Sequence, residues 1–474
     1  MKICLLSPVS AKLRMRFGVL LALLVAHAAA AADTVPLPQV GANPAATAEK
    51  GGIPGASLAN LLELLRKNNP DLAALRHDAQ MATERIYPAG ALADPIVERE
   101  LEIDNPAANE QELLNSLLNG TAGNAAPVGP RGGSVKYRFL QEVPFWGKRE
   151  FRRDRAAAEA DQFRWRAEKL WTEMAARMKG AFAQYYRIER VEKLTREILE
   201  LYADLERIAQ NRYAAGLIGQ QDVIRAQTEQ TRTRTELVGI ETERRNWQYR
   251  INSMLKRGSN EALAKPEAPR PVPSPERLAV MTLAERLKAR SPALFIEDAG
   301  IAYADKTRDL TYRNRWPDVA VGATTIYAGS RFQLWGLYAR VIIPLQLERR
   351  RSEEREAEEM VLAAQARRAA AENQLLADLS ENLAQLEAAR EIEKLARTSL
   401  VPQAELTYQA ALRAYQSSKA DFAVADGFQT SKVDFAALLE AQRQIRNAKL
   451  EQLKAEAETQ VRLAEIERLV GEDL

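Results

Sequence analysis

The sequence predicts a mainly helical protein with a small β part that crosses a membrane. Two long stretches, 148–212 and 347–414, are rich in Ala, Leu, Glu, Arg and Gln and hold a single proline between them, Pro402. Four further segments have strand character and a length of about 10–14 residues, enough for a tilted strand to cross a bilayer. The same order of elements occurs twice, which predicts an internal duplication of a strand–strand–long helical hairpin unit.

The N-terminus has the pattern of a secretory signal peptide. Four basic residues precede the apolar run FGVLLALLVA, and small residues follow it up to Asp33. The run is too short to span a bilayer; the alternative is a buried N-terminal helix. Removing residues 1–32 takes away four basic and no acidic residues, so the mature chain has a net charge of −1. This balance gives no indication of nucleic-acid binding.

Residue types that carry out catalysis or bind cofactors are scarce. The only cysteine, Cys4, lies ahead of the apolar run of the signal peptide, and the mature chain keeps one histidine, His77. No G-x-S-x-G, P-loop or HExxH motif is present. Met174 and Met178 are neighbours on a helix, where core packing is the favoured role. The sequence therefore predicts no enzyme, no cofactor and no metal site.

The duplication sets the predicted domain organisation. YAAGLIGQQDVIRAQ (213–227) resembles FQTSKVDFAALLEAQ (428–442). A local duplication, YQSSKADF (415–422) and FQTSKVDF (428–435), lengthens either the turn or the hairpin of the second copy. In chain order the segments are a signal peptide (1–32), an N-terminal linker (33–56), a first repeat (57–257), a proline-rich linker (258–281) and a second repeat (282–471).

The strands are predicted from alternation of apolar and polar residues. In the second segment Val135, Tyr137 and Phe139 share one face. In the first, Glu98, Glu100 and Glu102 share a face, which suits a watery lumen better than a metal or acid/base site. The alternative to a membrane-spanning sheet is a small soluble one. The four predicted strands are 95–104, 135–145, 317–327 and 332–345.

Long helical hairpins follow each pair of strands, over 148–257 and 347–470. A helix of about 65 residues makes a rod of roughly 100 Å, and the returning helices are much shorter. Two stub helices have about the missing length, so each is expected to stack on the end of a returning helix. The returning helices are 222–257 and 436–470, and the stub helices are 70–92 and 292–313.

Taken together, the signal peptide, the duplicated unit and the glycine-containing turn RYAAGLIGQQDVIRAQ (212–227) resemble the TolC-like outer-membrane efflux protein (outer membrane factor) family. QEVPFWGKRE (141–150) is similar to the strand-to-helix junction of its heavy-metal (CzcC/CusC-like) branch. The resemblance covers about 57–471. It implies a homotrimer with a shared 12-stranded β-barrel in the outer membrane and an α-helical tunnel in the periplasm.

The resemblance also implies a passive duct in a tripartite efflux system. Its partners would be a periplasmic adaptor (membrane fusion protein), an inner-membrane RND-type pump and outer-membrane lipid, and its cargo heavy-metal cations. Drug efflux or type I protein secretion are the alternatives for the cargo. A periplasmic coiled-coil adaptor or structural protein is an alternative of a different class, which the membrane-length strands disfavour.

At the first junction the chain would leave the membrane. Proline ends the hydrogen bonding of a strand, and glycine allows the bend. The aromatic pair suits the membrane–water interface, and the two basic residues are expected to meet lipid phosphates. The junction residues are Pro144, Phe145, Trp146, Gly147, Lys148 and Arg149.

By the same resemblance, the hairpin ends would dock the adaptor. The gating carboxylates of the family correspond to Ala437 and Glu440, so this chain keeps an acid at one of the two positions. Asp222 of the other hairpin could supply the missing charge; alternatively it caps the returning helix. The docking residues are Gly216, Leu217, Ile218, Gly219, Ser431, Lys432, Val433 and Asp434.

Overall fold

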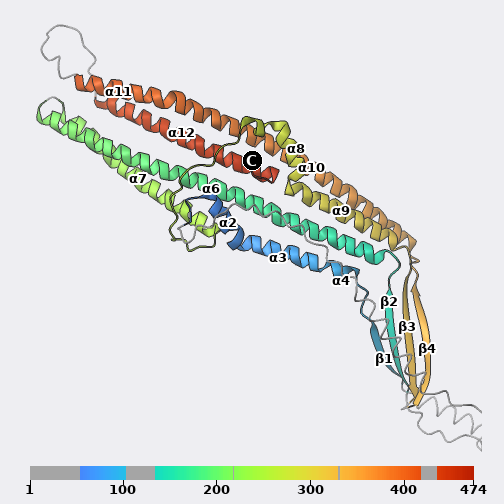
Figure 1. Cartoon of the computed structure of the whole chain (residues 1–474). Helices are drawn as coiled ribbons and strands as arrows, with labels where there is room; N and C mark the ends of the chain where they lie inside the picture. Colours follow the sequence, from blue (N-terminus) through green and yellow to red (C-terminus); the bar gives the residue numbers. More distant parts are fainter. Residues whose placement is uncertain (1–53, 103–133, 217, 329–330, 418–434) are drawn as a thin grey trace, which may run out of the picture. The chain divides into compact units, whose positions relative to one another are not determined.

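The computed structural model describes residues 54–102, 134–216, 218–328, 331–417 and 435–474, all within one compact unit (Figure 1). The predicted signal peptide (1–32) lies outside the described residues. So do the docking residues Leu217, Ser431, Lys432, Val433 and Asp434.

The helices account for most of the described chain. α6 alone runs for 67 residues, about 100 Å of rod. It packs against α7, α9, α12 and α3. The α-helices are α2 (Leu58–Asn68), α3 (Pro70–Glu84), α4 (Ile86–Gly90), α6 (Lys148–Ala214), α7 (Gln220–Met254), α8 (Val280–Arg290), α9 (Pro292–Arg313), α10 (Leu347–Leu395), α11 (Val401–Ser417) and α12 (Phe435–Val470), with a 3₁₀ turn at Pro275–Leu278.

A four-stranded antiparallel sheet lies where α6 and α10 begin (Figure 1). Its order is β1-β2-β3-β4, so the β2–β3 pairing joins the two repeats. β2 and β4 end earlier than the predicted segments 135–145 and 332–345. Each strand is followed by a proline, Pro144 or Pro344, which has no N–H to donate to a neighbouring strand. The strands are β1 (Ile96–Glu102), β2 (Ser134–Val143), β3 (Asp318–Ala328) and β4 (Arg331–Ile342).

The expected stacking of stub helices on returning helices is present at both places. Asn69 caps α3 by accepting from Leu72 N (3.0 Å), and its Nδ2 donates to the carbonyl of Met254 at the end of α7 (3.2 Å). In the second repeat, Gly471 follows α12 with φ of +85°. A Cβ there would lie 2.7 Å from the carbonyl oxygen of Arg290, just ahead of α9. Each pair therefore forms one interrupted rod.

The predicted helix over 347–414 is present, but its hydrogen-bonding pattern changes at one point. A π-helical turn at Ala396–Leu400 separates α10 from α11. Pro402 explains it: the ring has no N–H to donate and collides with the carbonyl four residues earlier, so the helix takes a wider turn there.

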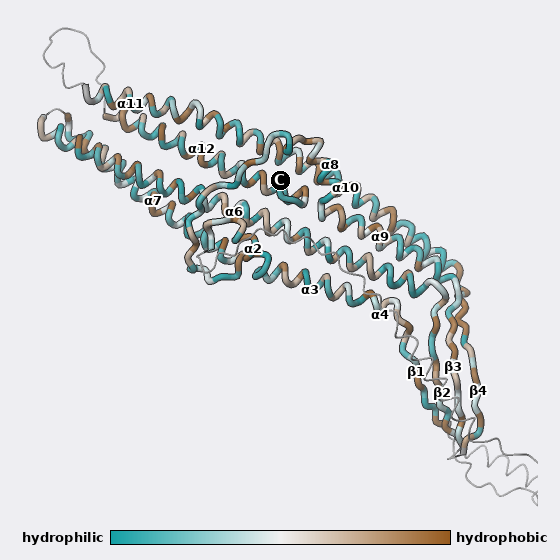
Figure 2. Tube along the Cα trace, in the orientation of Figure 1, coloured by the Kyte–Doolittle hydropathy of each residue, from teal (hydrophilic) through white to brown (hydrophobic). Residues whose placement is uncertain are grey.

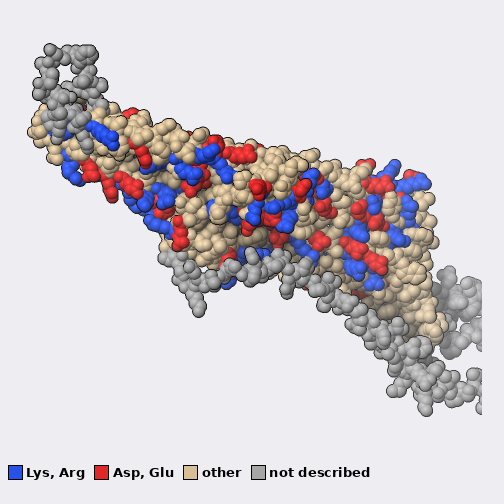
Figure 3. Space-filling view, turned by 45° about the horizontal axis from the view of Figure 1, so that its top comes forward, with Lys and Arg blue, Asp and Glu red and all other residues tan. Residues whose placement is uncertain are grey.

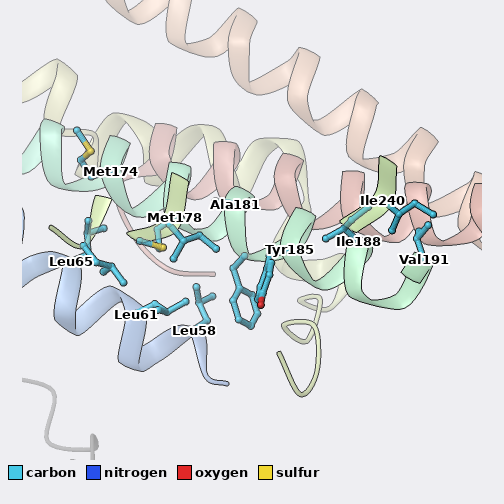
Figure 4. Close-up of a cluster of buried hydrophobic side chains, with 13 residues drawn as sticks. Leu58, Leu61, Leu65, Met174, Met178, Ala181, Tyr185, Ile188, Val191 and Ile240 are labelled. Carbon is cyan, nitrogen blue, oxygen red and sulfur yellow. The ribbon is translucent and has the colours of Figure 1, made fainter. Parts of the chain in front are cut away.

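The apolar core is divided into several clusters along the helices. Figure 2 shows hydrophobic and hydrophilic residues mixed along each helix. One cluster seats α2 on α6: Leu61 and Leu65 of α2 pack near Met178 and Tyr185 (Figure 4). Met178 is fully buried, which confirms a core role for this methionine.

Candidate functional site

One face of the sheet is mainly apolar, with Arg99 and Gln141 among its polar members. The register places Val97, Phe139, Ala323 and Leu337 in one row across the four strands. Val97 and Leu337 are 70% and 77% exposed, although they are large apolar side chains. The same face carries Leu101, Val135, Tyr137, Val319, Val321, Trp335 and Val341. Such a surface is unusual in water and typical of contact with lipid or another protein.

The opposite face carries charged side chains, as the alternation of the first strand predicts. Arg138 of β2 donates to Glu98 (2.9 Å) and Glu100 (3.1 Å) of β1. The backbone of Glu102 pairs with Ser134 of β2. Because Glu98 and Glu100 pair with an arginine, these two carboxylates are not arranged as metal ligands. In the described residues no group of three or more His, Cys, Asp or Glu is positioned to hold a metal ion.

An aromatic ring continues the charged face to β4. Tyr338 lies opposite Gly322 of β3, and a Cβ on that glycine would lie 2.7 Å from its ring and 2.5 Å from the carbonyl oxygen of Phe139. The guanidinium of Arg138 lies 6.0 Å from the centre of the Tyr338 ring. The register places Glu98, Arg138, Thr324 and Gly336 in one row across the four strands, and the ring of Tyr338 approaches Arg138 from the neighbouring row.

At the first junction, Gly147 provides the predicted bend, with φ of +89°. Phe145 stacks on Trp316, with 5.1 Å between ring centres, and Trp146 is 85% exposed. Arg149 donates from Nε to the carbonyl of Gly90 (2.8 Å).

Lys148 corrects the expectation that it meets lipid phosphates. It is buried, and its Nζ donates to Asp318 Oδ1 and to the carbonyl of Trp316, both at 2.8 Å. The same carboxylate oxygen accepts from the backbone N–H of Phe145 (2.9 Å). Sequence reasoning missed Asp318; the only available signal was a lone carboxylate at the start of a strand in the other repeat.

The described part of the first hairpin end is a tight turn. Gly216 has φ of +71°, and a Cβ there would meet nothing within 4 Å. Ile218 and Gly219 follow directly, and the Gly219 carbonyl accepts from Asp222 N (3.2 Å) at the start of α7. The turn therefore presents open space around Gly216.

The two acids of the predicted gate lie in different surroundings. Asp222 is buried in the first turn of α7, 3.7 Å from Arg225. Glu440 is exposed on α12, 3.4 Å from Arg443. The position of Asp222 also fits the alternative that it stabilises the helix N-terminus.

Near their ends the two hairpins are joined by polar contacts that the sequence did not predict. Arg212 of α6 donates to the carbonyl of Tyr415 (2.8 Å), and its guanidinium lies 4.2 Å from the centre of that ring. Arg446 of α12 pairs with Glu236 of α7 at 2.8 Å. In the apolar cluster of the same region, burial raises the pKa of the Tyr202 hydroxyl of α6.

Along the helices, acidic and basic side chains are interspersed on the face in Figure 3, with no large patch of one sign. Within the described ranges, no helix has the length and apolar character needed to cross a membrane.

A comparison with known families gives a match to part of the first repeat. Residues 61–255 match the outer membrane efflux protein family. The members of this family are passive ducts and not enzymes. Members of this family lie in the outer membrane with their helical part in the periplasm, which is the location expected for this chain.

Solved channels of the outer membrane have the same fold over nearly the whole chain. The structure superposes on the channel OprN with a TM-score of 0.68, 16% identity and coverage of 87% of this chain and 89% of OprN. For VceC of Vibrio cholerae the values are 0.69, 15%, 88% and 96%. For CusC they are 0.70, 12%, 92% and 99%. A search of curated proteins finds no match.

Proposed function

We propose that this chain is the outer-membrane channel of a tripartite efflux system, a passive duct from the periplasm to the exterior. The observation that carries the proposal is a sheet of membrane-length strands, mainly apolar on one face and charged on the other, joined directly to rods of about 100 Å. The match to outer membrane efflux proteins supports it.

The duct is a homotrimer with a 12-stranded barrel. β1 and β4 are the edges of the four-stranded sheet. Unpaired strand edges are not stable in lipid, so four strands need further copies to close. Three copies give twelve strands. The mainly apolar face then contacts lipid, and the opposite face, with Glu98, Arg138 and Tyr338, lines the lumen.

The closed barrel also separates this proposal from its alternative, a periplasmic coiled-coil adaptor or structural protein. In a water-soluble adaptor, a row of exposed large apolar side chains would be unfavourable. Val97 and Leu337 of this row are mostly exposed in one chain. The number of chains in the particle extracted into detergent tests whether the barrel is shared. Native mass measurement should give a three-chain species, whereas a stable monomer that inserts into bilayers would rule out the shared barrel.

The partners are a periplasmic adaptor and an inner-membrane RND-type pump, with docking at the hairpin ends. The open space at Gly216 supports a docking role. Gly216→Trp should abolish transport and leave the trimer intact. Gly239→Trp on α7, where a Cβ also meets nothing within 4 Å, is the matched control. Normal efflux by the Gly216 variant would count against docking there.

Heavy-metal cations are the proposed cargo, on the basis of the QEVPFWGKRE junction. Drug efflux and type I protein secretion are the competing cargoes. A duct needs no metal ligands of its own, so the absence of such clusters from the described residues does not bear on the cargo.

Asp222 and Glu440 remain the proposed acidic gate, with a reduced net charge because each lies beside an arginine. Single-channel recording of wild type, Asp222→Asn and Glu440→Gln tests both the duct and the acidic gate. Wild type should form ion-conducting pores in planar bilayers; if it does not, the duct is wrong. If it conducts and neither variant changes cation selectivity, only the gate is wrong.

A further inference from the structure

Every junction between the sheet and the helices carries a large apolar side chain that is exposed to solvent. Tyr87 (83% exposed) precedes β1, Trp146 (85%) follows β2, Trp316 (52%) precedes β3 and Leu345 (80%) follows β4. None of the four belongs to a strand. In the proposed duct, the level at which the strands meet the helices is where a bilayer meets the periplasm, because the strands have the length of a membrane crossing.

Basic residues gather at the same level. α6 begins KREFRRDR (148–155), five basic residues against two acidic, and α10 begins LERRRSEER (347–355), four against three. Cations are unfavourable in the first turn of a helix, because its N-terminal end carries partial positive charge. Both repeats nevertheless place exposed arginines there, where the anionic headgroups of a bilayer would be favourable partners.

Arg153, Arg349 and Arg351 are exposed, and each pairs with a carboxylate of its own helix. Arg153 is 58% exposed and lies 3.7 Å from Asp154, its neighbour in sequence. Arg349 and Arg351 are each 66% exposed and pair within their own helix, with Glu353 and Glu348. Exposed ion pairs of this kind contribute little to stability, so a phosphate can replace the carboxylate partner at small cost.

We propose that these residues form a collar that binds anionic phospholipids, with headgroup phosphates on the arginines and acyl chains against the apolar side chains. The collar consists of Tyr87, Trp146, Trp316 and Leu345 with Arg149, Arg153, Arg349 and Arg351. Aromatic and basic side chains together are typical of the membrane–water interface. The inference rests on the proposed membrane-inserted duct and names the lipid chemistry that the duct selects.

The test compares two pairs of substitutions in the full-length protein. Arg153→Gln with Arg351→Gln changes one exposed arginine of the collar on α6 and one on α10. Arg177→Gln with Arg367→Gln makes the same change on the same two helices, at exposed positions farther along each. Each protein is reconstituted in phosphatidylethanolamine with or without phosphatidylglycerol, extracted in detergent and weighed by native mass spectrometry, which counts retained lipids.

Wild type and the control should retain phosphatidylglycerol in preference to phosphatidylethanolamine. The collar variant should lose that preference by about fivefold for each arginine removed. Equal retention in the collar variant and the control would overturn the proposal. So would displacement of the lipid by inorganic phosphate, which would mark a site for the free ion.

Loss of the three-chain species in the collar variant would also overturn the proposal, since the arginines would then contact a second copy. The conductance of wild type is recorded separately. A conducting wild type without lipid preference contradicts the collar alone, whereas a wild type that does not conduct contradicts the duct itself.

Discussion

Lys148 Nζ and Asp318 Oδ1 lie 2.8 Å apart and connect the start of α6 in the first repeat with the start of β3 in the second. The side chain of Lys148 is 3% exposed and that of Asp318 is 38% exposed. The pair thus closes the point at which the β2–β3 pairing ends and the helices begin.

Lys148→Met should destabilise the protein by about 1–3 kcal/mol, because it leaves a partly buried carboxylate with one hydrogen-bond donor fewer. Urea unfolding in detergent micelles, followed by tryptophan fluorescence, measures the change. Lys169→Met is the control, since Lys169 is half exposed and 4.0 Å from Glu173. It should change the free energy of unfolding by no more than about 0.5 kcal/mol. Equal losses in both variants would mean that the pair contributes nothing specific.

Two glycines of the α6 region should respond oppositely to alanine. Gly147→Ala forces a side chain into the left-handed conformation and should cost about 1–2 kcal/mol. Gly180 lies inside α6, and a Cβ there would make an ordinary contact of 3.9 Å with Val461 of α12. Gly180→Ala should therefore be neutral or stabilising by up to about 1 kcal/mol. The same unfolding measurement checks both. A Gly147 variant as stable as wild type would show that the junction can bend elsewhere.

Gly322→Ala should impair assembly of the sheet, because its Cβ would lie 2.5 Å from a backbone oxygen that cannot move away. Gly336→Ala on β4 is the matched control, with its nearest atom, Thr324 Cγ2, at 3.5 Å. The fraction of heat-resistant oligomer on gels without boiling should fall in the first variant and not in the second. If both variants assemble normally, Tyr338 does not require the space above Gly322.

Stability should fall in acid partly through Glu354. A hydrogen bond from Arg315 lowers the pKa of this carboxyl below its usual value. The pair therefore contributes stability above the usual pKa of a glutamate, and this contribution is lost as pH falls through the lowered value. Arg315→Gln should flatten the acid side of the stability–pH curve, whereas Glu359→Gln at an exposed site should not. An unchanged acid limb in the Arg315 variant would exclude the effect.

Periodicity and proline placement were enough to predict the long helices and the four strands within a few residues. These signals are local: the alternation around Tyr137 or the proline-free run of α6 can be recognised in a short window. Even Pro402 was visible, and only its effect, a π-helical turn in place of a continuous helix, was missed.

The candidate site was less predictable, because its contacts join distant positions. Lys148 and Asp318 are 170 positions apart, and Arg212 and Tyr415 are 203 apart. The sequence shows a basic residue at the junction but not the carboxylate that receives it. For Lys148 the nearest plausible partner was lipid, and the fold supplied an internal one. The trimer, the docking residues and the gate stay predictions.

The interrupted rods have an electrostatic and a mechanical consequence. At Asn69 the negative end of α7 meets the positive end of α3, and at Gly471 α12 meets α9 in the same sense, so the helix dipoles run head to tail as they would in an unbroken rod. Yet no continuous ladder of main-chain hydrogen bonds crosses either joint. Tilting one segment against the next therefore requires less work than bending α6. The joints are therefore the points of the bundle that bend at the lowest cost, beside the unbroken α6.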